Sequence, residues 1–124
     1  MTQAGEGRPA RIDFAAAEAA ESGMVVAEAL PPAAAGWPFQ ASRWEVPPGR
    51  TSELDLHDVA EVWLVRSGQG TVLSGGTELP VRAGEMVFMA SRVPHQVRNT
   101  GTEALRMFSV WWPSGPGPTP DGAP

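Results

Sequence analysis

The sequence predicts an all-β protein whose strands close into an antiparallel sandwich or barrel. From residue 24 onward, short apolar and β-branched runs alternate with turns that are rich in glycine and proline. This part of the chain sustains no helical pattern of apolar residues and contains no repeat of the kind that builds a solenoid. A chain of 124 residues is therefore most simply a single β domain.

The chain is expected to divide into an N-terminal tail or arm over residues 1–22, a barrel over 23–112 and a tail over 113–124. The last segment is rich in proline and glycine and has almost nothing to bury, so we expect it to be disordered. Residues 11–22 are rich in alanine and glutamate, and Gly23 follows them. This composition predicts either a short peripheral helix or a docked arm.

Eight strands are predicted in the barrel segment, and each is bounded by a turn. They cover residues 24–30, 39–46, 59–66, 71–73, 78–81, 86–89, 95–98 and 105–112. Pro31-Pro32 ends the first strand and Pro47-Pro48-Gly49 ends the second, because proline and glycine interrupt strand pairing. Gly68-x-Gly70 and Gly75-Gly76 are typical of hairpin turns and do not form a dinucleotide-binding fingerprint.

The composition excludes several kinds of chemistry. The chain has no lysine, no cysteine and only two histidines, and its nine basic residues are all arginines. Without lysine there can be no Schiff-base catalysis, and without cysteine there can be no thiol nucleophile, thiolate metal site or disulfide. Acid–base or metal chemistry must therefore depend on His57, His95 and the carboxylates.

The charge pattern also bears on partners and location. The net charge is −5 and the arginines are scattered, which argues against a nucleic-acid partner. No apolar segment approaches the length of a membrane span, so we expect no membrane partner. The absence of cysteine fits a reducing compartment, and we expect a cytoplasmic protein.

Acidic residues and one histidine gather at the start of the third predicted strand. If this segment is extended, Asp55, His57 and Glu61 point to the same face, because side chains alternate along a strand. A helix would also bring His57 and Glu61 together but would turn Asp55 away, and the run Val-Trp-Leu-Val over residues 62–65 favours a strand. Three potential metal ligands then share one face, the alternative being an inert, solvated acidic surface.

The second histidine follows a proline-containing turn at the start of another predicted strand. With both histidine regions in view, the sequence resembles the cupin superfamily. The first cupin motif, G-x5-H-x-H-x3-E-x6-G, corresponds to Gly49, Asp55 in place of the usual first histidine, His57, Glu61 and Gly68. The second motif, G-x5-P-x-G-x2-H-x3-N, corresponds to Gly84, His95 and Asn99, with Ala90 and Arg92 in place of the usual proline and glycine.

The resemblance covers about residues 39–112 and implies a small single-domain jelly roll, or double-stranded β-helix, of the cupin type. It also implies one divalent metal ion inside the barrel, with Asp55, His57, Glu61 and His95 as ligands. Two imidazoles with one or two carboxylates suit Fe²⁺, which is favoured, and also Mn²⁺, Ni²⁺ or Zn²⁺. Asp55 is expected either to bind the metal or to orient a metal-bound water as a base, and loss of the metal is the alternative.

The neighbouring residues bear on the substrate pocket. Alternation places Trp63 and Val65 inside with Glu61, and it places Val62 and Leu64 outside against another sheet or subunit. The side chains predicted to line the substrate pocket are Arg43, Trp63, Phe88, Met107 and Phe108, and the pair Trp111-Trp112 gives further candidates for lining the barrel. The alternative for the apolar side chains is that they only form part of the hydrophobic core. The alternative for Arg43 is that it lies on the surface and does not contact a substrate carboxylate.

The favoured function is a metal-dependent enzyme that acts on a small organic substrate inside the barrel, with a non-haem oxygenase or dioxygenase as the leading reaction. Asp55 or Glu61 would be the catalytic base. The alternatives are a metal-assisted isomerase, lyase or cyclase and a non-catalytic cupin that binds a small molecule. The resemblance also implies a homodimer, and one of Trp111 and Trp112, which must face opposite sides, could lie at its interface.

Overall fold

The computed structural model describes residues 8–30 and 38–113, and these residues form an all-β fold. Their strands are β1 (Asp13–Phe14), β2 (Glu18–Ala19), β3 (Val25–Leu30), β4 (Gln40–Val46), β5 (Val59–Ser67), β6 (Gln69–Ser74), β7 (Thr77–Arg82), β8 (Met86–Met89), β9 (His95–Asn99) and β10 (Leu105–Pro113). The eight predicted strands correspond to β3 through β10, with ends that differ by at most two residues. The predicted Pro31-Pro32 turn and nearly all of the predicted C-terminal tail lie outside the described residues.

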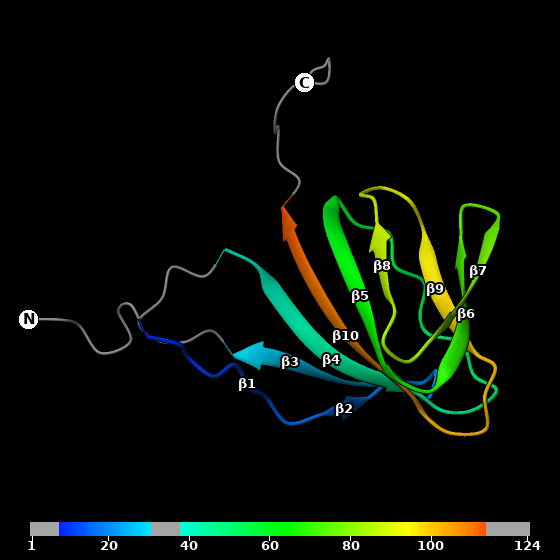
Figure 1. Cartoon of the computed structure of the whole chain (residues 1–124), viewed down its shortest axis with the longest axis horizontal. Coiled ribbons are helices and arrows are strands. Elements are labelled where there is room, and N and C mark those ends of the chain that lie inside the picture. The colour runs from blue at the N-terminus through cyan, green and yellow to red at the C-terminus, as the bar shows by residue number, and fades with distance from the viewer. Residues whose placement is uncertain (1–7, 31–37, 114–124) are drawn as a thin grey trace, which may run out of the picture.

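The strands form two antiparallel sheets that face each other as a jelly roll (Figure 1). The larger sheet has the order β1-β3-β4-β10-β5-β8, with β2 also paired to β3, and the smaller sheet has the order β7-β6-β9. In Figure 1 the long strands of the larger sheet fan out on the left, and the smaller sheet closes the right side. No helix that could cross a bilayer is found in the part of the chain that the structure describes.

The N-terminal segment is an arm that pairs with β3. β1 pairs with the end of β3 and β2 pairs with its start. The helix that was one expectation for residues 11–22 is not formed. A segment this short gains little from helix formation alone, whereas the edge of β3 offers unpaired backbone groups for the arm to satisfy.

The core lies between the two sheets and is built by strand alternation. On β5, Trp63 and Val65 are buried as predicted, whereas Val62 and Leu64 are half-buried on the opposite face. Those two outward residues pair across the sheet with Val110 and Phe108 of β10. The buried core cluster contains Trp44, Val46, Trp63, Val65, Val72, Val81, Met89, Val97, Leu105 and Met107.

A tight hairpin sets the register of the smaller sheet. Gly75 and Gly76 have φ angles of 56° and 83° and form the two-residue loop between β6 and β7. Positive φ at both positions is the requirement of a type I′ turn, and glycine meets it without strain. β6 carries β9 on its other edge, with Ser74 opposite His95. The hairpin therefore helps to fix the position of the second predicted site histidine.

Candidate metal centre

The segment before β5 extends the smaller sheet along the free edge of β9. Ser52 donates its backbone N–H to the carbonyl of Val97 at 2.8 Å, and Asp55 and His95 exchange two backbone hydrogen bonds, each of 2.9 Å. An antiparallel pair that exchanges both bonds places its two side chains next to each other on one face. The backbone thus brings Asp55 of the first motif to His95 of the second.

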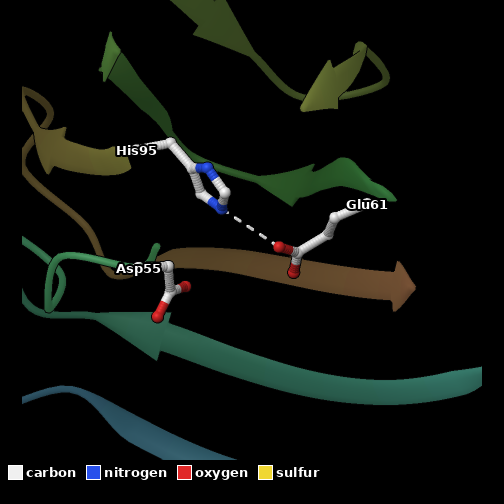
Figure 2. Close-up of side chains that lie close together, drawn as sticks. All are labelled: Asp55, Glu61 and His95. Atoms are coloured by element: carbon white, nitrogen blue, oxygen red, sulfur yellow. Dashed lines mark hydrogen bonds and ion pairs between the residues drawn. The ribbon is translucent and has the colours of Figure 1, made fainter. Parts of the chain in front are cut away.

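Glu61 completes the cluster from the opposite sheet. It lies near the start of β5, is 6% exposed, and places Oε1 3.1 Å from Nε2 of His95. Figure 2 shows the side chains of Asp55, Glu61 and His95 pointing toward one another from three different parts of the fold. One potential ligand atom from each lies within 4.8 Å of the others. Three residues of the predicted ligand set therefore converge on one point.

The orientation of the His95 ring is fixed by the backbone. Nδ1 lies 2.9 Å from the carbonyl oxygen of Val93, so this nitrogen carries the hydrogen and donates it. Nε2 then faces Glu61, and burial, which lowers the pKa of His95, is outweighed by the hydrogen bonds to Glu61 and Val93, which raise it above its ordinary value. Nε2, which is directed at Glu61, is the ring nitrogen that would bind a metal.

The two carboxylates differ in their electrostatic surroundings. Burial raises the pKa of Glu61, but the donor groups of His95, Trp63 and Ser109 outweigh it, so the net shift is downward. Burial raises the pKa of Asp55, the charge of Glu61 raises it further, and the nearby histidines lower it by less. The donor groups around Glu61 thus favour its anionic form, whereas the surroundings of Asp55 favour its protonated form.

Two tryptophans and a serine support Glu61 from inside the barrel. Trp44 donates its indole N–H to Ser109 Oγ at 2.6 Å, which leaves the serine hydroxyl hydrogen for Glu61. The ring of Trp63 packs edge-on between the rings of Trp44 and His95, with centroid distances of 5.0 and 5.2 Å. The N–H of Trp63 is close enough to lower the pKa of Glu61 yet has no acceptor within hydrogen-bond distance.

Sequence reasoning did not identify Trp44 or Ser109 as parts of the site. Strand alternation gives the only available signal, because each residue occupies an inward position on a predicted strand. Their meeting depends on the pairing of β4 with β10, where Ser42 lies opposite Ser109 and Trp44 opposite Met107. That register is a long-range property that one sequence does not display.

His57 lies at the margin of the cluster. The extended segment expected around it is interrupted, because β5 begins only at Val59. The His57 side chain is 52% exposed, and its Nε2 lies 3.5 Å from Oδ1 of Asp55. It is therefore not one of the three groups that converge, although it borders the same cavity as Asp55 and Glu61. Its role as a metal ligand stays a prediction.

A cavity of about 470 Å³ adjoins the carboxylates and is large enough for a small organic molecule. It lies against the inner faces of β3, β4, β5 and β10, together with the segment that precedes β5. Its walls combine acidic with apolar and aromatic side chains. The lining residues are Ala20, Met24, Val26, Glu28, Ser42, Trp44, Glu53, Asp55, His57, Asp58, Val59, Glu61, Ser109 and Trp111.

None of the five residues predicted to line the substrate pocket is among those that line this cavity. Trp63 and Met107 belong to the core beneath it. Arg43 and Phe108 lie opposite each other on β4 and β10, at outward positions, and the arginine stacks 4.5 Å from a ring of β1. Phe88 is exposed on the edge strand β8. In the observed strand register, alternation points the side chains of Arg43, Phe108 and Phe88 away from the barrel interior.

Arg92 occupies the position of the usual glycine in the second motif. Its φ of 66° makes it the one non-glycine residue with positive φ in residues 8–30 and 38–113. Its backbone N–H donates to the carbonyl of His57 at 2.6 Å, and its Nε donates to Oδ1 of Asp58 at 2.9 Å. Arg92 thus links the loop of the second motif to the segment of the first, in a backbone conformation that glycine adopts more easily.

Comparison with known proteins places the fold and the motifs in a family context. The family model of the cupin domain matches residues 42–111. An oxalate-binding protein from Thermotoga maritima is 30% identical over 70 residues, which cover 56% of this chain and 58% of that protein. The xanthan biosynthesis protein XanB from Xanthomonas campestris pv. campestris is 33% identical over 76 residues, which cover 60% of this chain and 16% of that protein. The match thus spans less than two thirds of either relative.

Solved structures agree with the family match. The crystal structure of a Cupin 2 conserved barrel domain protein from Salinispora arenicola superposes with a TM-score of 0.69 at 29% sequence identity. The superposition covers 76% of this chain and 79% of that chain. The relation therefore includes the barrel as a whole and extends beyond the two short motifs.

Proposed function

This chain belongs to the cupin family, and we propose that it is a metal-dependent enzyme that acts on a small organic molecule, with a non-haem oxygenase as the favoured reaction. The observation that carries the proposal is the convergence of Asp55, Glu61 and His95 within 4.8 Å, with both carboxylates on the wall of the 470 Å³ cavity. A buried ligand cluster beside a cavity of this size is the arrangement that a metal-assisted reaction requires.

The donor set fits a first-row divalent ion. The three convergent groups supply one imidazole nitrogen and two carboxylate oxygens, and His57 offers a second imidazole 3.5 Å from Asp55. Two imidazoles with one or two carboxylates suit Fe²⁺, and also Mn²⁺, Ni²⁺ or Zn²⁺. The hydrogen bond from His95 Nδ1 to Val93 supports the fit, because it presents Nε2 as the ligand atom.

Bound iron would supply one-electron chemistry with dioxygen, and a redox-inactive ion would supply Lewis acidity. Glu61 and His95 are buried and serve to hold the ion in place. Asp55 borders the cavity, is more accessible than Glu61 and has a raised pKa, so we assign it the role of catalytic base. Trp44 forms part of the wall that separates the cluster from water.

Two other functions have specific support. The similarity to an oxalate-binding protein favours a binder that takes up a small molecule without turnover. As a catalytic base, Asp55 would also serve a metal-assisted isomerase, lyase or cyclase, because such a reaction needs a proton transfer but no oxidant. Both alternatives use the same cavity and the same ligands, so only turnover measurements separate them.

The remaining expectations concern assembly and location. A homodimer is supported by Met86 and Phe88, which are 68% and 63% exposed on the edge strand β8. Apolar side chains exposed beside an unpaired strand edge are a common feature of protein interfaces. A cytoplasmic location stays a prediction, and so does the absence of nucleic-acid and membrane partners.

The test begins with metal analysis of the purified protein after growth with Fe, Mn, Ni and Zn. We expect close to one equivalent of a single ion, and a content below about half an equivalent would contradict the proposal. Oxygen uptake is then measured with a panel of small organic compounds, with the His95→Ala variant as the control. Uptake coupled to product supports the oxygenase, product without uptake supports the isomerase or lyase, and binding without product supports the binder.

A further inference from the structure

We propose that the cavity selects a small organic cation, such as a protonated amine attached to an apolar body. The proposal rests on the proposed function for the identity of the site, and it adds the class of molecule that the site takes. It is carried by the carboxylates on the cavity wall, by the lack of any arginine or lysine among the lining residues, and by a tryptophan beside a site carboxylate.

The charges on the wall are nearly all negative. Five of the fourteen lining residues are carboxylates, namely Glu28, Glu53, Asp55, Asp58 and Glu61, and none is an arginine. The chain has no lysine, Arg92 pairs with Asp58 at 2.9 Å, and Arg50 donates to the backbone carbonyl of Ser22, whose hydroxyl lies 3.5 Å from Glu53. Even with a divalent ion bound at Asp55 and Glu61, carboxylates outnumber positive charges around the cavity. A cation therefore gains from this potential, and an anion is repelled.

The acidic groups lie at different depths. Glu61 is buried at the ligand cluster, whereas Glu28 is exposed on β3, opposite Ser42 of β4. Glu53 is also exposed, within 3.5 Å of the Ser22 hydroxyl. The exposed carboxylates are thus at the mouth, where a ligand can reach them without displacing the buried pair. An ammonium group is the chemical partner that fits this mouth.

The cavity wall also has an apolar surface that can contact the apolar part of the ligand. Trp111 lies directly opposite Glu61 in the β5–β10 register, so its side chain shares the inner face with that carboxylate. Met24, Val26 and Trp44 extend the apolar wall toward β3 and β4. The face of an indole ring attracts cations as well as apolar groups, and tryptophan is the strongest of the aromatic residues in this respect. An amine that carries an aromatic or aliphatic body matches both properties of the wall.

Apart from a bound metal ion, a dicarboxylate such as oxalate would meet no positively charged arginine or lysine on this wall. Recognition of a small dianion by side chains calls for arginine or lysine, because those residues supply positive charge and several donors. In the described residues the lining carries neither, and the arginines on the outer face, such as Arg43, lie on the far side of the larger sheet. The side chains of the cavity wall therefore favour a cation over a dicarboxylate.

The experiment uses three probes with the same apolar body and different charge: 2-phenylethylamine, 2-phenylethanol and phenylacetate, with oxalate as a fourth. Calorimetric titration is performed on the whole protein, both metal-loaded and after chelator treatment. We expect the amine to bind roughly tenfold more tightly than the alcohol, and phenylacetate and oxalate to bind more weakly than either. The advantage of the amine should shrink as salt is raised, because added ions screen the wall.

A matched pair of variants locates the effect. The double variant Glu28→Gln/Glu53→Gln should weaken binding of the amine by about five- to tenfold and leave binding of the alcohol unchanged. The control is Glu78→Gln, which removes one exposed carboxylate from β7 of the smaller sheet, away from the cavity. That control should leave the affinities of all four probes unchanged.

The outcomes separate this inference from the proposed function. Equal affinities for amine and alcohol, tighter binding of phenylacetate or oxalate, or no binding of the amine at millimolar concentration would each overturn the inference, even in a protein that binds its metal. A preference for the amine that persists in a protein without metal would support the inference while the proposed function failed. A preference that is unaffected by Glu28→Gln/Glu53→Gln would show that the cavity wall is not its source and would also overturn the inference.

Discussion

The four predicted ligands form two pairs that the fold holds with different rigidity: Glu61 with His95, and Asp55 with His57. The side chains of Glu61 and His95 are 7% and 3% exposed, they come from regular strands, and each has a further hydrogen-bond partner. The side chains of Asp55 and His57 are 36% and 52% exposed and come from the segment between β4 and β5. The difference indicates that the barrel fixes the first pair when it folds, whereas the second pair is able to adjust to an ion or a ligand.

The largest expected effect comes from breaking the buried pair. His95→Ala removes a predicted ligand and leaves the Glu61 carboxylate buried without its partner, so we expect metal affinity to fall roughly 100-fold or more. The free energy of unfolding of the metal-free protein should also fall by about 3 kcal/mol, because an uncompensated charge remains in the core. Competitive metal titration and urea unfolding measure the two effects. Retention of full metal affinity would show that His95 is not a ligand.

The exposed pair should respond less to the same change. We expect His57→Ala to lower metal affinity about tenfold and to leave the free energy of unfolding nearly unchanged, because the side chain is half exposed. The same two measurements, made side by side with His95→Ala, give the comparison directly. If His57→Ala matched or exceeded the loss caused by His95→Ala, the ordering of the two pairs would be wrong.

The contribution of Trp63, which packs against His95 and approaches Glu61, can be tested with a conservative substitution. Trp63→Phe keeps an aromatic ring against His95 but removes the N–H that approaches Glu61, so we expect metal affinity to fall by several-fold. The free energy of unfolding should fall by about 1–2 kcal/mol, because the smaller ring leaves a cavity in the core, whereas the lost N–H adds little since it has no hydrogen-bond acceptor. Trp112→Phe, outside the cavity lining, is the matched control. Unchanged metal affinity in Trp63→Phe would remove this residue from the site.

The smallest expected effect concerns Arg92, which links the loop of the second motif to the segment that carries Asp55 and His57. Arg92→Gly and Arg92→Ala both lose the exposed ion pair with Asp58, but only glycine relieves the positive φ at this position. We therefore expect the glycine variant to be more stable than the alanine variant by about 1 kcal/mol. Thermal unfolding of the two variants measures the difference. An alanine variant as stable as the glycine variant would mean that the loop relaxes when the side chain is removed.

Local signals were sufficient to predict the strands of the barrel. Glycine and proline marked the turns, and the run around Trp63 gave the correct inward and outward faces of β5. The N-terminal segment was harder, because alanine and glutamate favour a helix in isolation, whereas the edge of β3 offered pairing that composition does not reveal. In that segment the tertiary context outweighed intrinsic preference.

The sequence was sufficient to predict the candidate metal ligands of the site but not the full set of residues that line its cavity. Asp55, Glu61 and His95 could be named because their spacing matches two motifs and because the chain has so few alternative ligands. Trp111 was a candidate for the barrel lining and does line the cavity, but Glu28 could not be named, because the place of its strand in the sheet depends on long-range pairing. Arg43 and Phe108 were assigned to the pocket on residue type alone, and the final register places them on the opposite face.

The reciprocal backbone pairing of Asp55 and His95 also sets the time at which the cluster can form during synthesis. The two residues are 40 positions apart in the chain, so the entropy of closing that loop is lost before the pair is made. A chain emerging from the ribosome therefore completes the cluster only after β9 has been released. If the proposed site binds its ion, uptake follows folding and stabilises the finished barrel by mass action.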